Sequence, residues 1–212
     1  MDNLDFADIG IRYISLVILL TFHEFGHAWM AMKCGDDTAK LQGRVSLNPL
    51  VHMELIGTVV LPLMMMILPG SYSRFMIGWA KPVPVNISNL KNRNWDDIWI
   101  TMAGPAMNLF LAVAIVALIK ALEIFHIEQG LEYAWNAAYM SLLLCFFNLI
   151  PIPPLDGSHL MRKIVGMSHE TYAQIAQYGL FLVILFLQIP GVRQFLNGVC
   201  LVVLAAINTV FR

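Results

Sequence analysis

The chain has 212 residues and a formal net charge of −1, with 58% apolar and only 13% charged residues. A soluble domain has about 45–50% apolar and about 25% charged residues, so this composition excludes a soluble globular domain, a disordered chain and a coiled coil. The near-neutral charge gives no electrostatic footprint for nucleic acid, and three cysteines without motif spacing predict no disulfide scaffold. We therefore predict an all-α polytopic membrane protein that contacts the lipid bilayer along most of its length.

Five apolar segments predict the membrane-spanning helices. The first segment covers about residues 9–32, and four windows without Asp, Glu, Lys or Arg follow it at residues 98–119, 133–155, 171–192 and 194–211. A helix needs about 20 residues to cross the hydrocarbon core. These segments predict a bundle of five transmembrane helices, or six if a shorter apolar stretch at residues 55–68 also crosses.

The stretch at residues 55–68 is only 14 residues long and contains Pro62. The polar loops on its two sides both carry excess Lys and Arg, which is typical of cytoplasmic loops. We therefore expect this stretch to be re-entrant or membrane-dipping, with an ordinary transmembrane helix as the alternative. The proline-interrupted run at residues 80–86 cannot form a helix interior and predicts a short extended loop segment.

The first apolar segment contains the HExxH motif His23-Glu24-Phe25-Gly26-His27. Two histidines four residues apart lie on one face of a helix, with the spacing that a zinc ion needs from two ligands. Glu24 lies beside the first histidine, where it can act as the general base on the attacking water. An ionisable group inside an apolar span costs at least ~2.5 kcal/mol and indicates function. The alternative is a pair of structural histidines with Glu24 as their salt-bridge partner.

A catalytic zinc ion usually has three protein ligands, so a third ligand is expected elsewhere in the chain. Asp156 is the strongest candidate because it directly follows an apolar segment, in a proline-rich turn where Gly157 permits close backbone approach. With the re-entrant topology, Asp156 also emerges on the same side of the membrane as the two histidines. The weaker candidates are His52, His159 and two histidines expected in polar loops, His126 and His169.

These motifs together resemble the intramembrane metalloproteases of the site-two protease family. The resemblance rests on the HExxH motif, on Ala103-Gly104-Pro105 with Asn108, and on Asn148 followed by the turn that contains Asp156-Gly157. The stretches at residues 43–49 and 78–86 resemble the short bacterial and archaeal members. The likeness covers roughly residues 10–165, and it includes neither the PDZ domain nor the CBS domain of larger members.

The resemblance implies one zinc ion per chain, held by His23, His27 and Asp156, with Glu24 as the catalytic glutamate. It places Asn148 near the metal, where the side-chain amide could donate a hydrogen bond to the developing oxyanion; a helix–helix hydrogen bond is the alternative role. The implied reaction is hydrolysis of peptide bonds within or near transmembrane segments of membrane-protein substrates, which is regulated intramembrane proteolysis.

The apolar segments predict a multi-pass protein, the resemblance implies a prokaryotic cell membrane, and the basic loops predict an active site nearer the cytoplasmic side. We expect an intramembrane metalloprotease core at residues 1–165 and a C-terminal transmembrane helical hairpin at residues 166–212. A membrane metal-binding transporter and a non-catalytic scaffold of the same fold are the alternative functions. The sequence does not indicate the oligomeric state.

Overall fold

The computed structural model describes residues 6–67 and 78–211, and every regular element in those ranges is helical. The four longest helices are α1 (Phe6–Lys33), α4 (Arg93–Ile124), α5 (Leu131–Asn148) and α9 (Pro190–Val210). The shorter ones are α2 (Thr38–Leu41), η1 (Pro49–Val51), η2 (Leu55–Val60), α3 (Leu61–Ile67), η4 (Ile87–Asn89), α6 (Asp156–Val165), α7 (His169–Ala176) and α8 (Gly179–Leu187). The prediction of an all-α fold is confirmed.

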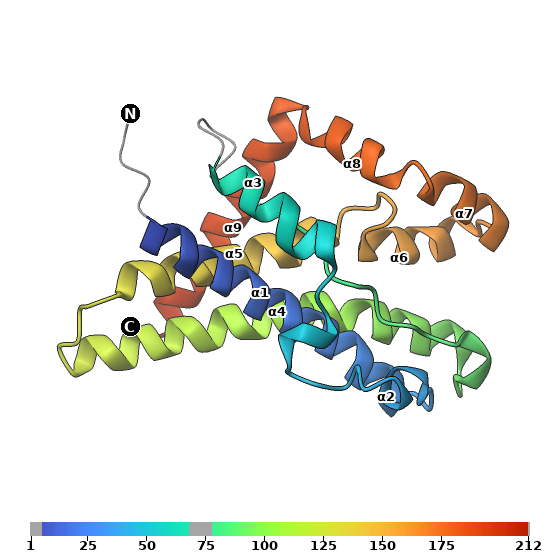
Figure 1. Ribbon diagram of the computed structural model, residues 1–212, viewed down its shortest axis with the longest axis horizontal. Helices are drawn as coiled ribbons and strands as arrows, with labels where there is room; N and C mark the ends of the chain where they lie inside the picture. Colours follow the sequence, from blue (N-terminus) through green and yellow to red (C-terminus); the bar gives the residue numbers. More distant parts are fainter. Residues whose placement is uncertain (1–5, 68–77, 212) are drawn as a thin grey trace.

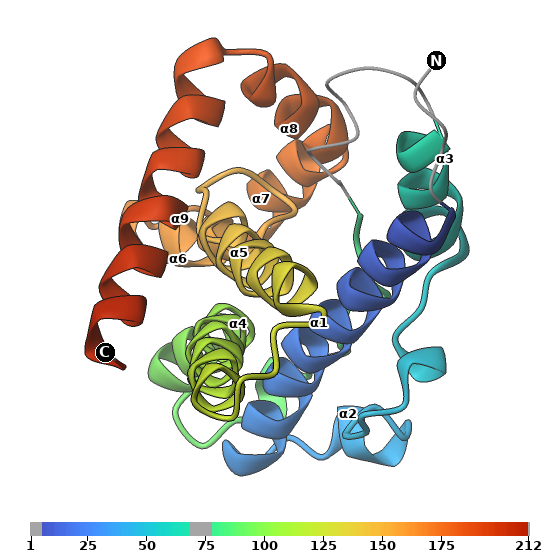
Figure 2. The same ribbon diagram turned by 90° about the vertical axis from the view of Figure 1, so that its left-hand side faces the viewer.

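Helix α5 lies in the middle of the bundle, with α1, α4 and α9 around it (Figures 1 and 2). The largest core cluster joins Ala112 of α4 and Leu142 of α5 to Cys200 of α9, and all three are fully buried. Val183 of α8 packs into the same cluster. The C-terminal hairpin therefore shares a core with the preceding helices, and the division of the chain near residue 165 stays a prediction.

Small residues allow α1 and α4 to cross closely. A Cβ atom on Gly26 would lie 2.7 Å from the carbonyl oxygen of Ala103, and one on Gly104 would overlap the ring of His27. Close crossings at Gly and Ala are typical of helices packed within a bilayer, where van der Waals contact replaces the hydrophobic effect. The HExxH segment is consequently held directly against the middle of α4.

Within residues 6–67 and 78–211, three helices, α1, α4 and α9, contain segments that are long and apolar enough to cross a membrane. The α7–α8 pair adds a fourth if its two helices, bent by 57°, form one span. Helix α5, which carries Glu132, Asn136 and Asn148, is not among these candidate spans. The multi-pass architecture is therefore supported, while the count of five to six crossings is not confirmed.

The stretch predicted to be re-entrant forms η2, which is a π-helix, and α3, and its last residue lies outside the described ranges. These 13 helical residues extend about 20 Å, less than the roughly 30 Å of a hydrocarbon core. The backbone N–H of Trp79 donates to the carbonyl oxygen of Gly57 at 3.1 Å. This hydrogen bond brings the chain after α3 back beside the start of η2.

The segment at residues 79–86 is extended, as predicted, and ordered polar groups hold it along one edge. The buried Arg44 guanidinium donates to the carbonyl oxygen of Lys81. The backbone N–H of Asn86 donates to Oδ2 of the fully buried Asp36 at 2.7 Å. These bonds fix the segment against the loop that follows α1.

The C-terminal part differs in two places from the expectation. The polar residues around His169 form α6 and the first turn of α7 rather than a loop. Helix α6 has the acidic Asp156 in its first turn and basic residues in its last turn, and both complement the helix dipole. Helix α9 begins at Pro190, several residues before the charge-free window, because proline is favoured at the first helical position.

Candidate metal centre

Three side chains from two distant parts of the chain converge at one point. The Nε2 atoms of His23 and His27 lie 3.1 Å apart on α1. Oδ2 of Asp156, the first residue of α6, lies 3.2 Å from Nε2 of His23 and 3.4 Å from Nε2 of His27. A tetrahedral ion with ligands about 2.0–2.1 Å away requires about 3.3–3.4 Å between ligand atoms. The spacing of the three atoms therefore fits a tetrahedral metal ion.

The surroundings of this triad favour a cation rather than simple packing. Oδ2 of Asp156 is buried and has no hydrogen-bond partner among the residues that the structure describes. Gly104 leaves the space open, because a Cβ atom there would lie 2.7 Å from Cε1 of His23 and overlap the His27 ring. Two imidazoles and one carboxylate form a donor set of the kind found in catalytic zinc sites.

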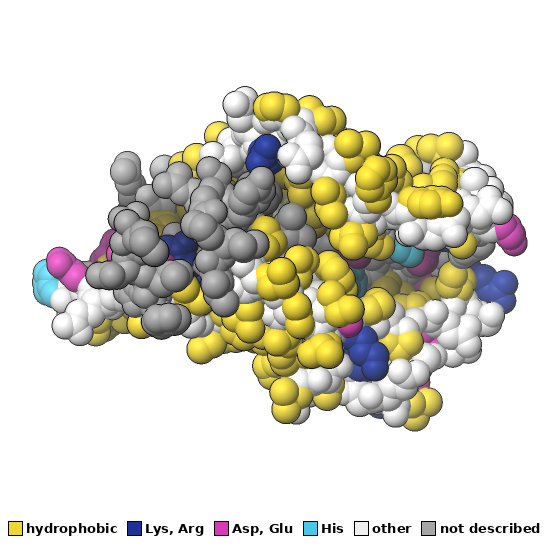
Figure 3. All heavy atoms as spheres, turned by 45° about the horizontal axis from the view of Figure 1, so that its top comes forward, with side chains coloured by type: hydrophobic (Ala, Val, Ile, Leu, Met, Phe, Trp, Pro, Cys, Tyr) yellow, Lys and Arg dark blue, Asp and Glu magenta, His cyan; other side chains and the backbone are white. Residues whose placement is uncertain are grey.

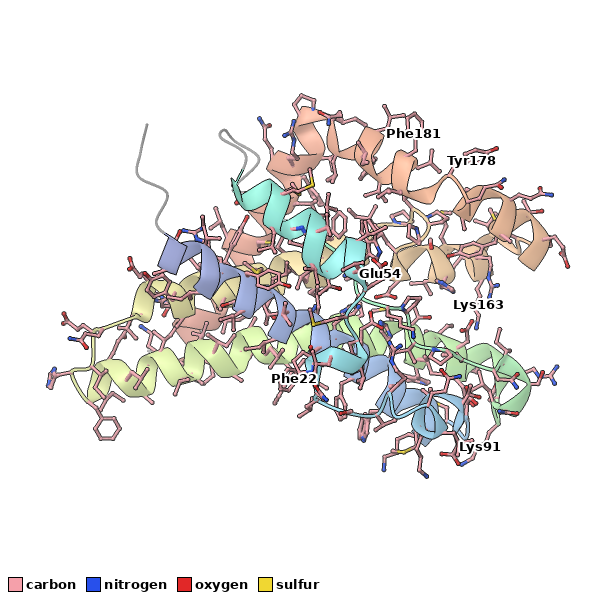
Figure 4. All side chains as sticks on the ribbon, in the orientation of Figure 1. Phe22, Glu54, Lys91, Lys163, Tyr178 and Phe181 are labelled. Carbon is pink, nitrogen blue, oxygen red and sulfur yellow. The ribbon has the colours of Figure 1, made fainter. Side chains whose placement is uncertain are left out.

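Two ion pairs hold the helix that carries Asp156. Nζ of Lys163 lies 2.9 Å from Oδ2 of Asp97, and an Arg162 nitrogen lies 3.5 Å from the same oxygen. Figure 4 shows Lys163 between α6 and α4. Arg162 and Asp97 are both buried, so these ion pairs hold α6 against α4.

The charge on Asp156 is set by its two neighbours. Burial raises the pKa of its carboxyl group, but the positive charge of a protonated His27, followed by the contribution of His23, outweighs burial and holds the pKa well below its usual range. Asp156 is therefore an anion near neutral pH, which is the form that binds a metal ion. Nearby, burial lowers the pKa of His159, although Asp97 and Asp156 partly oppose this shift.

Helix α4 contacts the outer nitrogen of each histidine in the triad. Nδ1 of His27 lies 2.7 Å from the carbonyl oxygen of Ile100. Because that oxygen can only accept, Nδ1 carries a proton, so a neutral His27 would present the lone pair of Nε2 to the triad. Nδ1 of His23 lies 3.1 Å from Nδ2 of Asn108, which is fully buried.

Glu24 and the triad line one cleft of about 700 Å³. Glu24 is only 8% exposed, and its Oε2 atom has no hydrogen-bond partner in the described part of the chain. Figure 3 shows histidine and acidic side chains at the bottom of a crevice with apolar rims. The cleft thus combines a candidate metal centre, a carboxylate free to move a proton, and walls suited to an apolar substrate.

Asn148 lines the same cleft, at the end of α5. Its Nδ2 atom donates to the carbonyl oxygen of Leu144 at 2.9 Å, within its own helix rather than to a neighbouring helix. One amide hydrogen is used in this way and the other is available. The oxyanion role of Asn148 stays a prediction.

Three other histidines, His52, His126 and His159, do not belong to the triad. His52 is buried and its Nε2 lies 2.8 Å from the carbonyl oxygen of Ser46, which assigns it to the loop structure. His159 lines the cleft and packs against the ring of Tyr172, with 5.1 Å between ring centroids. His126 is exposed in the turn after α4. The side chain of His169 lies outside the described residues.

Several cleft residues were not predicted from the sequence. Tyr172, Leu180 and Val183 from the C-terminal helices form part of one wall. They occupy an apolar segment without a recognisable motif, so nothing in the residue pattern distinguishes them from lipid-facing side chains.

The sequence profile of peptidase family M50 matches residues 12–138 and 126–189 of this chain. A protein named "Putative zinc metalloprotease YwhC" from Bacillus subtilis (strain 168) is 35% identical over 182 residues, which are 82% of this chain and 78% of that protein. "Putative zinc metalloprotease Rip2" from Mycobacterium tuberculosis (strain ATCC 25618 / H37Rv) is 30% identical over 201 residues, 92% of this chain and 74% of that protein.

A protein of the same name from Mycolicibacterium smegmatis (strain ATCC 700084 / mc(2)155) is 27% identical over 199 residues. These are 87% of this chain and 72% of that protein. No solved structure matches the chain significantly.

Proposed function

Since this chain belongs to peptidase family M50, we propose that it hydrolyses peptide bonds within or near transmembrane segments of membrane-protein substrates. The family includes the site-two proteases, so the resemblance drawn from the motifs is confirmed. The protein is a metalloprotease, and the names of its relatives support Zn²⁺ as the metal. The observation that carries the proposal is the convergence of His23, His27 and Asp156 beside Glu24 in one cleft.

We propose that His23, His27 and Asp156 hold one zinc ion per chain. When bound, zinc would supply a Lewis acid that polarises the scissile carbonyl group and activates the attacking water near neutral pH. The Glu24 carboxylate would take a proton from that water and deliver it to the leaving amine. The free amide hydrogen of Asn148 would stabilise negative charge on the carbonyl oxygen.

A substrate helix must unwind before hydrolysis, because its carbonyl groups are already hydrogen-bonded and shielded. Ala80, Val83 and Val85 of the extended segment line the cleft, while Lys81 is bonded to the loop on the other side. We propose that an unwound substrate lies along this segment in β-type addition. The alternative is that the segment only packs as a loop.

We propose that the C-terminal hairpin, residues 166–212, covers the cleft and that residues 1–165 carry the catalytic groups. Leu180 and Val183 of α8 face the cleft. Tyr178 and Phe181 lie on the outer side of the same hairpin (Figure 4), where their side chains are 62% and 66% exposed. One side of the hairpin would therefore contact the substrate, and the other side would contact lipid.

We also propose a location in a prokaryotic cell membrane, with the cleft nearer the cytoplasm. Among the described residues, the segment from the end of α1 to the start of α4 carries six basic residues: Lys33, Lys40, Arg44, Lys81, Lys91 and Arg93. Basic loops close to membrane spans are retained in the cytoplasm. The orientation follows from this charge bias.

The two alternative functions are less well supported. A metal transporter would need a series of polar ligands along a route through the membrane, whereas the residues that the structure describes offer one compact triad beside Glu24. A non-catalytic scaffold would not need Glu24, which lies buried in the cleft and lacks a hydrogen-bond partner among the described residues.

The proposal is tested with the full chain purified in detergent. We expect about one zinc ion per chain, cleavage of a model transmembrane peptide, loss of cleavage after chelation, and recovery after zinc is added back. Zinc-dependent cleavage of the apolar segment would support the proposal. A zinc-replete protein that transports metal in vesicles and leaves every tested membrane peptide intact would contradict it.

A further inference from the structure

Asn108 occupies an unusual position in α4. It is fully buried within an apolar span, where a polar side chain without full hydrogen bonding is costly. Its amide Nδ2 lies 3.1 Å from Nδ1 of His23, yet its Oδ1 has no hydrogen-bond partner in the described part of the chain. Packing alone does not explain why an amide occupies this position.

The chemistry of His23 determines which group is the donor in the contact between Asn108 and His23. A neutral imidazole has one N–H group, and a histidine that offers Nε2 to a metal must carry its hydrogen on Nδ1. An amide NH₂ group facing that N–H would place two donors against each other. The amide orientation with Nδ2 toward His23 is therefore incompatible with His23 as an Nε2 ligand.

A half-turn of the amide removes both difficulties at once. The nitrogen and oxygen of an asparagine side chain have nearly the same shape, and their placement is decided by the hydrogen bonds around them. The half-turn brings Oδ1 to the place of Nδ2, where it accepts from Nδ1–H of His23. Oδ1 of Asn108 then has a hydrogen-bond donor, and the two N–H groups of Asn108 and His23 no longer face each other.

We infer that Asn108 is a positioning residue that accepts the Nδ1–H hydrogen bond of His23 and so directs Nε2 of His23 toward the metal. Helix α4 then serves both histidines, because the carbonyl oxygen of Ile100 already accepts from Nδ1–H of His27 at 2.7 Å. The Ile100 acceptor is backbone and survives substitution. Asn108 is the acceptor that mutation can remove.

This inference rests on the proposed role of His23 as a metal ligand. Outer partners of ligating histidines fix the tautomer and ring orientation, and their loss typically costs about 10–100-fold in metal affinity. We expect an effect of that size on zinc binding itself, so the test does not depend on proteolysis.

The experiment measures zinc affinity of the full chain in detergent by competition with a chromophoric chelator. Asn108→Leu keeps the size of the side chain and removes the acceptor, so we expect a 10–100-fold loss of zinc affinity. Asn108→Asp can accept but not donate, so we expect affinity within a few-fold of wild type. Asn108→Ala replaces the leucine variant if that variant fails to fold, as judged by thermal unfolding without metal.

Ser141→Ala is the matched control. Ser141 is fully buried on α5, and its hydroxyl donates to the backbone carbonyl oxygen of Asn108 at 2.7 Å. The substitution disturbs the same α4–α5 contact and leaves the amide in place. We expect zinc affinity close to wild type.

Two results would overturn the inference alone: wild-type affinity in Asn108→Leu or Asn108→Ala, or equal losses in Asn108→Asp and Asn108→Leu. The second result would assign Asn108 as a donor. A wild-type protein that binds no zinc would overturn the proposed metal site and this inference together, so the two failures are distinguishable.

Discussion

The backbone N–H of Lys81 donates to the carbonyl oxygen of His52 at 2.8 Å, and this bond joins the chain before η2 to the chain after α3. In Figures 1 and 2, α3 runs beside the N-terminal half of α1. The bond brings the two ends of the η2–α3 segment together, as we expect for a re-entrant segment. A helix that crossed the membrane fully would separate these residues by the thickness of the hydrocarbon core, about 30 Å.

This contact leads to a topology prediction. Single cysteines placed at the exposed residues Asp37, Ser88 and Glu128, in a background without the native cysteines, are probed on intact cells with a membrane-impermeant thiol reagent. We expect labelling at position 128 only, because the other two positions lie in basic loops predicted to be cytoplasmic. Labelling at position 88 from outside would show that η2–α3 crosses the membrane, and the five-crossing topology would be wrong.

Replacing Glu24 by Gln separates proton transfer from metal binding. We expect Glu24→Gln to reduce cleavage of a transmembrane peptide by about 10²–10⁴-fold, because an amide cannot act as a general base. Zinc content should stay close to wild type, since Glu24 is not one of the three converging ligands. Turnover near the wild-type rate in the glutamine variant would remove Glu24 from the mechanism.

Replacing Asp156 tests the third ligand. We expect Asp156→Ala to lower zinc content and activity together, because Oδ2 of Asp156 lies 3.2–3.4 Å from both histidine nitrogens. His52→Ala and His159→Ala are the matched controls, because neither side chain belongs to the triad. They should keep their zinc. A zinc-replete and active Asp156→Ala protein would rule this aspartate out as a ligand.

The sequence was most informative where chemistry and local geometry coincide. The HExxH spacing determined which face of α1 carries the histidines, and the proline-rich turn identified Asp156 as the residue that joins them. Both depend on short-range rules of helix periodicity and helix breaking. These rules act within a few residues, so a single sequence is enough to apply them.

Contacts between distant segments could not be predicted in the same way. The sequence singled out Asn108 only as one of the residues that carry the family resemblance, and nothing near it in sequence specifies His23 as its partner, 85 residues away. The burial of Asp36 depends likewise on a loop that arrives 50 residues later. Such pairings arise from tertiary packing, which periodicity does not encode.

Asp36 provides a stability prediction with a defined pH dependence. Its fully buried carboxylate accepts from Thr38, from the side chain of Asn89 at 2.9 Å and from the backbone of Asn86 at 2.7 Å. Burial raises the pKa of Asp36, but these hydrogen bonds prevail and lower it below 3.8. We expect Asp36→Ala to cost roughly 3 kcal/mol of stability at about pH 7, because several buried donors lose their acceptor.

The sign of the pH dependence follows from the lowered pKa. Stabilisation by the ionised carboxylate is fully present above pH 3.8 and is lost as the pH falls through the folded-state pKa. Thermal unfolding in detergent should therefore show a smaller gap between wild type and Asp36→Ala at about pH 3 than at about pH 7. Asp37→Ala, at an exposed neighbouring position, should stay within about 0.5 kcal/mol of wild type. A gap that widens on acidification would contradict the assignment.

Gly104 tests whether the metal centre needs α1 and α4 in direct contact. A Cβ atom at this position would overlap the His27 ring and lie 2.7 Å from Cε1 of His23, so neither histidine could keep its place. We expect Gly104→Ala to lower zinc affinity by roughly 100-fold, measured by chelator competition, because displaced ligands lose their geometry.

The matched control for that substitution is Gly198→Ala in α9. A Cβ atom on Gly198 would meet none of the described atoms within 4 Å. Alanine is the better helix former, by up to about 1 kcal/mol, so this variant should be at least as stable as wild type and keep its zinc. Gly104→Ala with wild-type zinc affinity would show that the two histidines do not bind metal from the position against α4, and the proposed triad geometry would be wrong.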